Sequence, residues 1–341
     1  MKLLKTAAFS ALITAGALCQ SVAAETVMRV GTWLPPTNPQ NATVWPTWAK
    51  WVEEATEGRV KVQMQEGLGH PKTLFNLVED GVVDVSFSVM GYLPGRFKLP
   101  MIAEVPNISD SAEATSVALW RTQEKYFAKA NELDGLELLG MFVHGPAQIH
   151  TREEINSLDD LKNKKIRTGG GMQTVIAERL GVTSIGAPAP KVYEMMQQGV
   201  VDGAFFPVQE QRFLRLAELS KQVTVIPKGL YANSFAIFAN PEFMEDLDPR
   251  DREAIMKVSG EKLSALAGKA WEDADKTGYK AAEEAGVRIL RLKESDPMLK
   301  EIRKRTADLA DAWMEDVKDR NVDAKGAYKY LKSQAASYKS K

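Results

Sequence analysis

The chain has 341 residues, of which 44% are hydrophobic and 26% are charged, a composition typical of a folded globular protein and not of a disordered or collagen-like chain. The length predicts two domains or one large domain. The 44 lysines and arginines are balanced by 45 aspartates and glutamates, so the chain lacks the basic excess that holds a polyanion, and we expect no nucleic-acid partner.

The first 24 residues have the three-part layout of a secretory signal peptide. Two lysines precede an apolar run over 6–18, and small residues end the segment at Ala24. The apolar run is shorter than the roughly 20 residues that span a bilayer, so we expect cleavage near Ala24 and a periplasmic protein. Removing the segment leaves 42 basic and 45 acidic groups and takes away Cys19, the only cysteine. We therefore expect no disulfide or thiol chemistry.

Strand-like and helix-like patterns alternate after the signal segment. The predicted strands are 27–33, 60–65 and 82–89, and the predicted helices between them are 44–55 and 71–80. This β-α-β-α-β order predicts a mostly parallel sheet with helices on its faces.

An internal echo predicts a second lobe of the same kind. Residues 76–84 resemble residues 194–202, and in both segments a helix ends at a glycine and a strand begins at once. Glycine favours the left-handed conformation that closes a helix, although such a turn is common enough to recur by chance. The second lobe is predicted to contain strands near 165–167, 183–185 and 202–206 and helices near 172–180 and 190–198.

The last part of the chain contains a long helical pattern. Predicted strands at 222–226 and 231–239 lead back toward the first lobe. Asp248 and Pro249 are typical of a helix start, and the apolar spacing predicts one helix from there to about 284, long enough to cross both lobes. Its three glycines at 260, 268 and 278 each weaken it by about 1 kcal/mol relative to alanine. A strand at 287–292 and two helices follow.

These elements predict an α/β, two-lobed periplasmic binding protein fold with a cleft between the lobes. We expect residues 25–145 plus 233–275 to form lobe I, and residues 146–232 plus 276–341 to form lobe II. The long helix, about 249–284, is shared by both lobes.

Motifs that signal an enzyme are missing from the sequence. It contains neither a Gly-x-Ser-x-Gly elbow nor a His-Glu-x-x-His zinc motif, and the three histidines, His70, His144 and His150, have no evident acidic neighbours. The glycine run 169–171 lacks the Gly-Lys-Ser/Thr of a phosphate loop and the third glycine of the dinucleotide fingerprint. We therefore expect no catalysis, no metal and no cofactor.

Arg167 is the strongest candidate for ligand binding. It ends a short predicted strand, and the glycine run that starts at Gly169 leads into a helix beginning near Met172. A helix N-terminus presents free N–H groups, and a guanidinium offers two parallel donors that match a carboxylate. The residues alone leave two interpretations open, a carboxylate receptor or a surface arginine paired with an acid such as Glu178.

Four tryptophans lie within residues 33–51. Trp48 and Trp51 fit a core between a helix and a sheet. Trp33 differs because it ends a strand just before two prolines, and strand ends in parallel sheets face the ligand crevice. Trp33 is therefore a candidate pocket wall, with a core position as the alternative.

Several segments occur in an order and spacing typical of one family. The strongest is Leu158–Arg167, and the others are 51–60, 81–84, 95–97, 180–181, 192–194 and 199–203. On these segments, which are spread over most of the mature chain, the protein resembles the DctP-like periplasmic solute-binding proteins of tripartite ATP-independent periplasmic (TRAP) transporters.

The resemblance implies a cleft that closes over one organic anion and a long helix that braces both lobes. It implies that Arg167 clamps the carboxylate of the ligand. It also implies two kinds of partner, a small organic acid and the small and large integral membrane subunits of a TRAP permease.

Two departures from the family pattern narrow the expected ligand. A second arginine, common in members that bind polar acids, would fall at Gln148, and a common asparagine would fall at Phe206. We therefore expect a monocarboxylate with an apolar or aromatic tail, such as a 2-oxo or 2-hydroxy acid. Its tail is expected to lie in a pocket lined by Phe206, Trp33 and Tyr92. Gln148 is expected to donate a second hydrogen bond, and Asn233 either contacts the ligand or satisfies backbone groups.

Two other functions stay open at this stage. One is a sugar-acid binding protein of the same transporter class, and the other is a periplasmic ligand sensor. The oligomeric state expected for either is a monomer.

Overall fold

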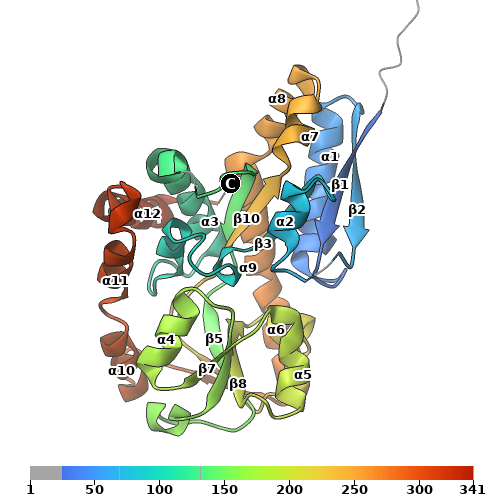
Figure 1. The fold of residues 1–341 in the computed structure, drawn as a ribbon. Helices are drawn as coiled ribbons and strands as arrows, with labels where there is room; N and C mark the ends of the chain where they lie inside the picture. Colours follow the sequence, from blue (N-terminus) through green and yellow to red (C-terminus); the bar gives the residue numbers. More distant parts are fainter. Residues whose placement is uncertain (1–24, 69, 131, 341) are drawn as a thin grey trace, which may run out of the picture.

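The computed structural model describes residues 25–68, 70–130 and 132–340, so the predicted signal peptide lies outside the described residues. Two sheets, one in each lobe, organise the chain (Figure 1). The first has the strand order β2-β1-β3-β10-β4. Its strands are β1 (Thr26–Thr32), β2 (Val60–Glu66), β3 (Val85–Val89), β4 (Glu137–Val143) and β10 (Ser234–Ala239).

The first sheet is parallel where the sequence predicts it. β1 pairs in parallel with β2 and β3, whereas β10 arrives from the second half of the chain and pairs antiparallel with β3 and β4. The helices that connect or follow these strands are α1 (Trp45–Ala55), α2 (Leu74–Glu79), α3 (Ala112–Thr122) and α7 (Pro241–Asp246). Trp45 and Trp48 of α1 are fully buried in the core beneath this sheet.

The second sheet has the order β11-β9-β5-β8-β6-β7. Its strands are β5 (Ala147–Thr151), β6 (Lys165–Thr168), β7 (Thr183–Gly186), β8 (Gly203–Pro207), β9 (Gln222–Val225) and β11 (Arg288–Arg291), and its helices are α4 (Met172–Leu180), α5 (Val192–Gln197) and α6 (Glu210–Phe213). The echo between the lobes is confirmed, because Gly81 and Gly199 both take positive φ, 66° and 72°, where a helix gives way to a strand. The two-lobed α/β fold is therefore the predicted one.

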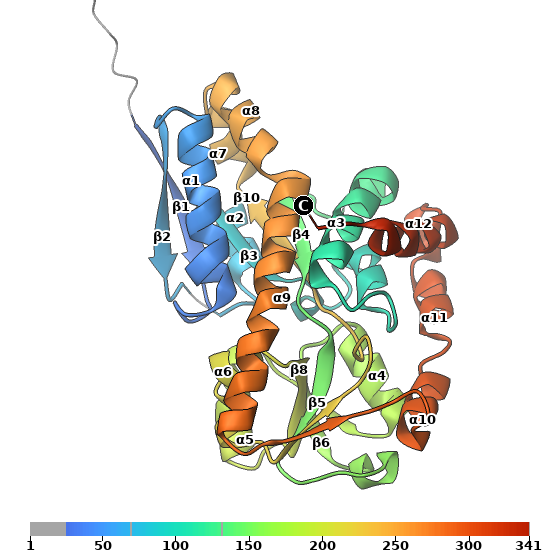
Figure 2. The same ribbon diagram turned by 180° about the vertical axis from the view of Figure 1, so that it is seen from behind.

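The long helix that braces both lobes is also confirmed, and it is interrupted once. α8 (Pro249–Val258) begins at Asp248, whose side chain accepts a hydrogen bond from the Arg250 N–H, and the chain then breaks at Ser259 before α9 (Gly260–Glu284). Gly260 takes φ +60°, which stops one continuous helix from forming. α9 packs against β4 and α3 near its start and against α6 and β11 near its end, so it runs past both sheets (Figure 2).

The glycines of α9 mark points of close backbone approach. A Cβ atom at Gly268 would lie 2.5 Å from Ser116 Oγ of α3, and one at Gly278 would lie 2.5 Å from the Cα of Gln209 in the second lobe. The loss of helix stability that glycine causes at these positions is therefore offset by tight packing against both lobes.

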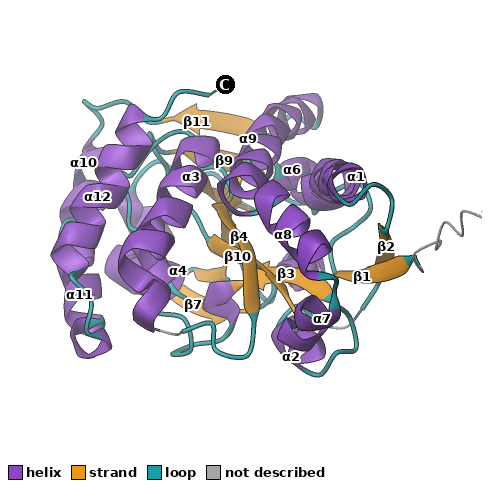
Figure 3. Ribbon diagram, turned by 90° about the horizontal axis from the view of Figure 1, so that it is seen from above, coloured by secondary structure: helices purple, strands orange, loops and turns teal. Residues whose placement is uncertain are grey.

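Three helices, rather than the predicted two, end the chain. α10 (Pro297–Arg305), α11 (Leu309–Asp316) and α12 (Ala324–Ser337) follow one another along one side of the molecule, opposite β1 and β2 (Figure 3). α10 packs against α4, whereas α12 packs against α3, where Arg121 donates to Gln334 Oε1 at 2.7 Å. The domain boundaries stay a prediction, and this C-terminal segment, assigned there to lobe II, contacts both lobes. No helix in the described part of the chain is long and apolar enough to cross a membrane.

The Gly278→Ala substitution is expected to lower the free energy of unfolding by about 1–3 kcal/mol, because the added methyl group collides with backbone and cannot be moved aside. The Gly186→Ala substitution is the matched control, since a Cβ there meets nothing within 4 Å. Urea unfolding of both variants measures the effect. Equal stability of Gly278→Ala and the parent would show that α9 does not lie this close to the second lobe.

Candidate functional site

Arg167 lies at the centre of the candidate site, where the two lobes meet. It stands in β6, is 1% exposed, and is held by a hydrogen bond from Nε to the Ala187 carbonyl at 2.8 Å. Its Cζ lies 4.2 Å from the centre of the Phe206 ring. The second donor nitrogen, Nη2, is 3.5 Å from the Tyr92 hydroxyl. The guanidinium is thus fixed by a carbonyl, a ring and a phenol.

The remaining nitrogen of Arg167, Nη1, is buried and has no hydrogen-bond partner within the described residues. The alternative of a surface arginine paired with Glu178 is wrong, because Arg167 is buried whereas Glu178 is exposed. A buried charge that lacks a counter-charge is costly. The arrangement is therefore suited to receive an anion at Nη1.

Tyr92 and Trp33 bring the first lobe to this arginine. The Tyr92 hydroxyl accepts a hydrogen bond from the Ala189 N–H of the second lobe at 2.9 Å. The Trp33 ring stacks on Phe87 with centroids 5.4 Å apart and meets Tyr92 edge-on at 6.2 Å. Trp33 also lines a hollow of about 470 Å³ at the edge of the interlobe boundary. It therefore lies between the core of its own lobe and the entrance to the site.

Phe206 and Gln148 are neighbours on adjacent strands of the second sheet, where they face each other in register. Phe206 is buried in an apolar cluster with side chains of α5 and the segment after α6. Gln148 accepts a hydrogen bond from the Ile226 N–H at 2.6 Å and donates to the Pro146 carbonyl at 3.0 Å. Its amide thus ties together two segments that cross between the lobes, and its predicted hydrogen bond to a ligand stays a prediction.

The glycine run after β6 is closely packed against the first lobe. A Cβ atom on Gly170, which has φ +86°, would lie 2.5 Å from the carbonyl oxygen of Gly91. Gly169 lies beside Arg167, because a Cβ there would be 3.2 Å from Nη2. Only glycine permits this approach of the two backbones.

Two N–H groups at the approach to α4 donate to protein side chains, whereas the sequence analysis expects free N–H groups there. The Gly169 N–H donates to Gln173 Oε1 at 2.8 Å, and the Met172 N–H donates to Glu104 Oε2 of the first lobe at 3.1 Å. Gln173 in turn donates to Asn233 Oδ1 at 2.6 Å. Asn233 Oδ1 therefore accepts from another side chain, and its predicted contact with a ligand stays a prediction. These bonds join the lobes.

Glu104 escaped the sequence reasoning. It is fully buried and also accepts hydrogen bonds from the Ser234 N–H at 3.0 Å and hydroxyl at 2.7 Å. Burial raises the pKa of its carboxyl group, and these hydrogen bonds act against that rise. The signal that could have revealed it is a single acidic residue inside the apolar run 99–105.

Two histidines near the site are buried and neutral. His150 Nε2 donates to the Phe206 carbonyl at 2.9 Å, and its Nδ1 accepts from Gln211 at 2.7 Å. His144 Nε2 accepts from the Asn233 N–H at 3.2 Å. Burial lowers the pKa of both rings to about 4. No cluster of side chains suited to a metal ion occurs in the part of the chain that the structure describes.

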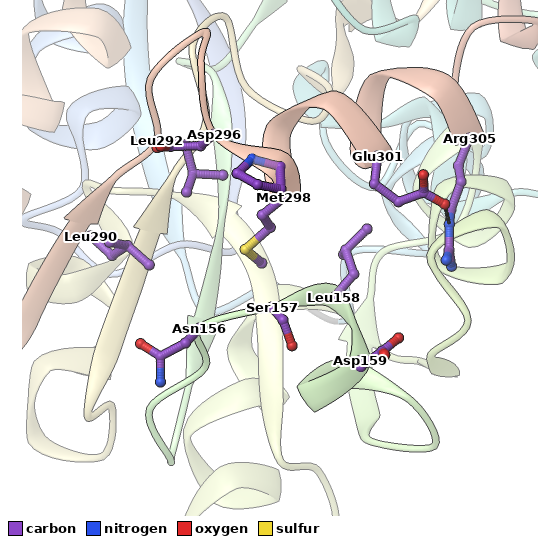
Figure 4. Close-up of a pocket in the computed structure, with 11 residues that line it drawn as sticks. Asn156, Ser157, Leu158, Asp159, Leu290, Leu292, Asp296, Met298, Glu301 and Arg305 are labelled. Atoms are coloured by element: carbon purple, nitrogen blue, oxygen red, sulfur yellow. Dashed lines mark hydrogen bonds and ion pairs between the residues drawn. The ribbon is translucent and has the colours of Figure 1, made fainter.

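A separate hollow of about 670 Å³ lies away from Arg167, between residues 156–159, β11 and α10 (Figure 4). Asp159, Asp296 and Glu301 contribute carboxyl groups to its wall, and Arg305 is paired with Glu301 at 2.8 Å. An acidic wall repels an anion. This hollow therefore does not compete with Arg167 as a site for organic acids.

Known proteins that are similar to this chain identify its family. The sequence model of the bacterial extracellular solute-binding proteins, family 7, matches residues 30–316. The chain belongs to this family. Its members include the periplasmic solute-binding proteins of TRAP transporters, as the resemblance implied.

Relatives and solved structures match nearly the whole chain. An outer membrane transporter protein, TsaT, of Comamonas testosteroni is 31% identical over 89% of this chain and 90% of its own. A TRAP periplasmic solute-binding protein from Bordetella bronchiseptica with bound (R)- and (S)-mandelate is 32% identical, with a TM-score of 0.88 over 91% of this chain and 99% of its own. A marine metagenome TRAP protein specific for aromatic acid ligands, in complex with 3-hydroxybenzoate, is 32% identical, with a TM-score of 0.86 over 93% and 100% of the two chains.

The free energy of unfolding of the parent, relative to that of the His150→Gln variant, is expected to fall by about 3 kcal/mol as the pH falls from 6.5 to 4. Burial lowers the folded pKa of His150 from 6.5 to about 4, so in this window the unfolded chain binds a proton that the folded chain does not. The parent therefore loses stability as the pH falls, and glutamine does not titrate.

Urea unfolding at pH 7.5 and pH 4 measures this difference, with the exposed His70→Gln as the control. A difference that does not change with pH would contradict a buried, neutral His150.

Proposed function

We propose that this protein is a periplasmic receptor for aromatic monocarboxylates that serves a TRAP permease. The observation that carries the proposal is the buried guanidinium of Arg167, whose Nη1 has no partner among the described residues. Each hydrogen bond between charged groups contributes about 1.5–3 kcal/mol, so a two-pronged carboxylate contact supplies a large share of the roughly 8 kcal/mol that micromolar binding requires.

The surroundings of Arg167 favour a ring over a polar tail. Two aromatic side chains, Phe206 and Tyr92, contact the guanidinium, and the Trp33 ring contacts Tyr92. Aromatic pairs are stabilised by edge-on and offset contacts. Burial of an apolar tail contributes about 25 cal/mol per Å². Mandelate and 3-hydroxybenzoate, bound by two of the similar proteins, combine a carboxylate with such a ring. A sugar acid, the alternative ligand, carries several hydroxyl groups and would place most of them against these rings.

Closure of the lobes is proposed to trap the ligand. The bonds between Tyr92 and Ala189, and between Glu104 and Met172, join the two lobes. A ligand that bridges the lobes adds to these contacts only in the closed form and so shifts the population toward it. The same motion would also let a sensory receptor detect the bound ligand. Co-purification with TRAP membrane subunits distinguishes transport from sensing.

The remaining parts of the proposal follow from the family and the residue chemistry. The protein acts as a monomer in the periplasm, after removal of residues 1–24, and hands its ligand to the membrane subunits of the permease. It performs no catalysis, because the described groups that contact Arg167 are a carbonyl, a phenol and a ring rather than a nucleophile with a base.

The Arg167→Ala substitution is expected to weaken binding of mandelate or benzoate by roughly 100-fold or more, because both charge-assisted hydrogen bonds are lost. Isothermal titration and ligand-induced thermal shifts measure the loss. Arg167→Lys keeps the charge but not the two parallel donors, so it is expected to bind with intermediate affinity. The control is Arg179→Ala, at an exposed arginine paired with Asp308. Parent-like binding by Arg167→Ala would refute the proposal.

The Phe206→Asn substitution is expected to weaken an aromatic acid by about 1–3 kcal/mol, because the ring beneath the guanidinium is replaced by a smaller, polar side chain. Affinities for benzoate and for acetate, measured on the parent and the variant, test this. If short polar acids bind the parent more tightly than aromatic acids do, the ligand class is wrong.

A further inference from the structure

A group of unsatisfied polar atoms lies on the second lobe, beside the site but outside the predicted set of residues. Glu210 begins α6 and is 5% exposed. Its Oε1 accepts a hydrogen bond from Gln209 Nε2 at 2.8 Å. Its Oε2 is buried without a partner in the described structure, as is Oε1 of Gln209. Such groups are rare in folded proteins, because each costs the free energy of removing it from water.

A complementary atom is supplied by the first lobe. Gln40, at the start of the short helical turn before α1, is fully buried, and its Oε1 accepts a hydrogen bond from Trp271 Nε1 at 3.3 Å. Its Nε2 is buried and, within the residues described, has no partner. The first lobe therefore presents a free donor, and the second lobe presents free acceptors.

Helix α9 brings these groups together. Trp271 contacts Gln40 of the first lobe, and Asp275 accepts a hydrogen bond from the Gln209 N–H of the second lobe at 2.9 Å. Residues 271 and 275 are four apart on one helix, so their side chains are neighbours on one face, with Cβ atoms about 5–6 Å apart. Gln40 and Gln209, the residue before Glu210, therefore contact neighbouring side chains of α9 from opposite lobes.

Glu210 lies close enough to Arg167 for their charges to interact. Burial raises the pKa of Glu210 to about 7, and the charge of Arg167 opposes that rise. Burial also raises the pKa of Tyr92, to which the charge of Glu210 adds. Trp271 packs against Phe235 with centroids 4.9 Å apart, and Phe235 continues through Phe87 to Trp33. A continuous series of ring contacts in the core of the first lobe thus runs from Trp271 to Trp33.

The chemistry of Gln40 and Glu210 selects one functional group. A hydroxyl group donates one hydrogen bond and accepts others, so it satisfies a free amide donor and a free carboxyl acceptor at once. An unsubstituted ring satisfies neither, and a second carboxylate would face the carboxyl group of Glu210. We propose that Gln40 and Glu210 form a hydroxyl-recognition subsite, so that the ligand is a hydroxylated aromatic monocarboxylate. The inference rests on the proposed function.

In the closed complex, the Gln40 amide donates to the hydroxyl oxygen of the ligand, and the hydroxyl donates to Oε2 of Glu210. Arg167 holds the carboxylate of the same ligand. The hydroxyl stands either on the carbon next to the carboxylate, as in mandelate, or on the ring, as in 3-hydroxybenzoate. A hydroxyl group at either position can donate and accept the same hydrogen bonds. The distance between the carboxylate and the hydroxyl decides which acid reaches Gln40 and Glu210.

Two matched pairs of acids test the subsite on the full mature protein by isothermal titration. Mandelate is compared with phenylacetate, and 3-hydroxybenzoate with benzoate. We expect at least a tenfold preference for the hydroxylated member in one pair, because its absence leaves buried polar groups unpaired. The pair that shows the preference identifies the position of the hydroxyl. Equal affinities within both pairs overturn the inference while leaving the proposed function standing, whereas failure of all four acids to bind overturns the proposed function itself.

Two variants assign the preference to these residues. Glu210→Leu and Gln40→Met each remove one partner of the hydroxyl, from opposite lobes, and are expected to bring the affinity ratio of the preferred pair close to one while binding of the unhydroxylated acid persists. Glu104→Gln is the control at a buried acid whose oxygens are already bonded, so it is expected to change both members of a pair alike. A ratio that stays unchanged in Glu210→Leu and Gln40→Met would assign the unsatisfied atoms to a structural role.

Discussion

A guanidinium group buried between two lobes, with one nitrogen left free of protein partners among the described residues, is the interaction on which the structure depends. Arg167 is held in place by the Ala187 carbonyl, the Phe206 ring and the Tyr92 hydroxyl, none of which neutralises its charge. Burial strengthens any interaction with an anion, because the effective dielectric constant is far lower than in water. The same burial makes the charge costly when it is left alone. In the proposed function, binding and closure are coupled through this one side chain.

The rest of the molecule keeps this side chain in position. α9 passes both sheets with glycines where its backbone meets α3 and the turn before α6. Glu104 of the first lobe accepts a hydrogen bond from the first residue of α4 in the second. These contacts join the two lobes through backbone as well as side chains. The position of Arg167 between the lobes therefore depends on close backbone approach as much as on its own neighbours.

Much of the fold and the central residue could be predicted from the sequence, because they depend on local patterns. Hydrophobic periodicity located the strands, and the order of short segments up to Arg167 indicated the family. The partners of Gly169 and Met172 could not be predicted in this way, because Gln173 and Glu104 reach them only after the lobes come together. The unsatisfied atoms of Gln40 and Glu210 were hidden for the same reason, since 170 positions separate the two residues and their burial follows only from the folded structure. The break at Ser259 depended on the backbone angle of Gly260, which apolar spacing does not reveal.

The most direct measurement is a crystal structure of the mature protein in complex with mandelate. The account predicts that the two carboxylate oxygens lie within hydrogen-bonding distance of Nη1 and Nη2 of Arg167, with the ring on the Phe206 side of the cleft. A ligand whose carboxylate points away from Arg167, or an occupied cleft whose guest carries no acid group, would contradict it.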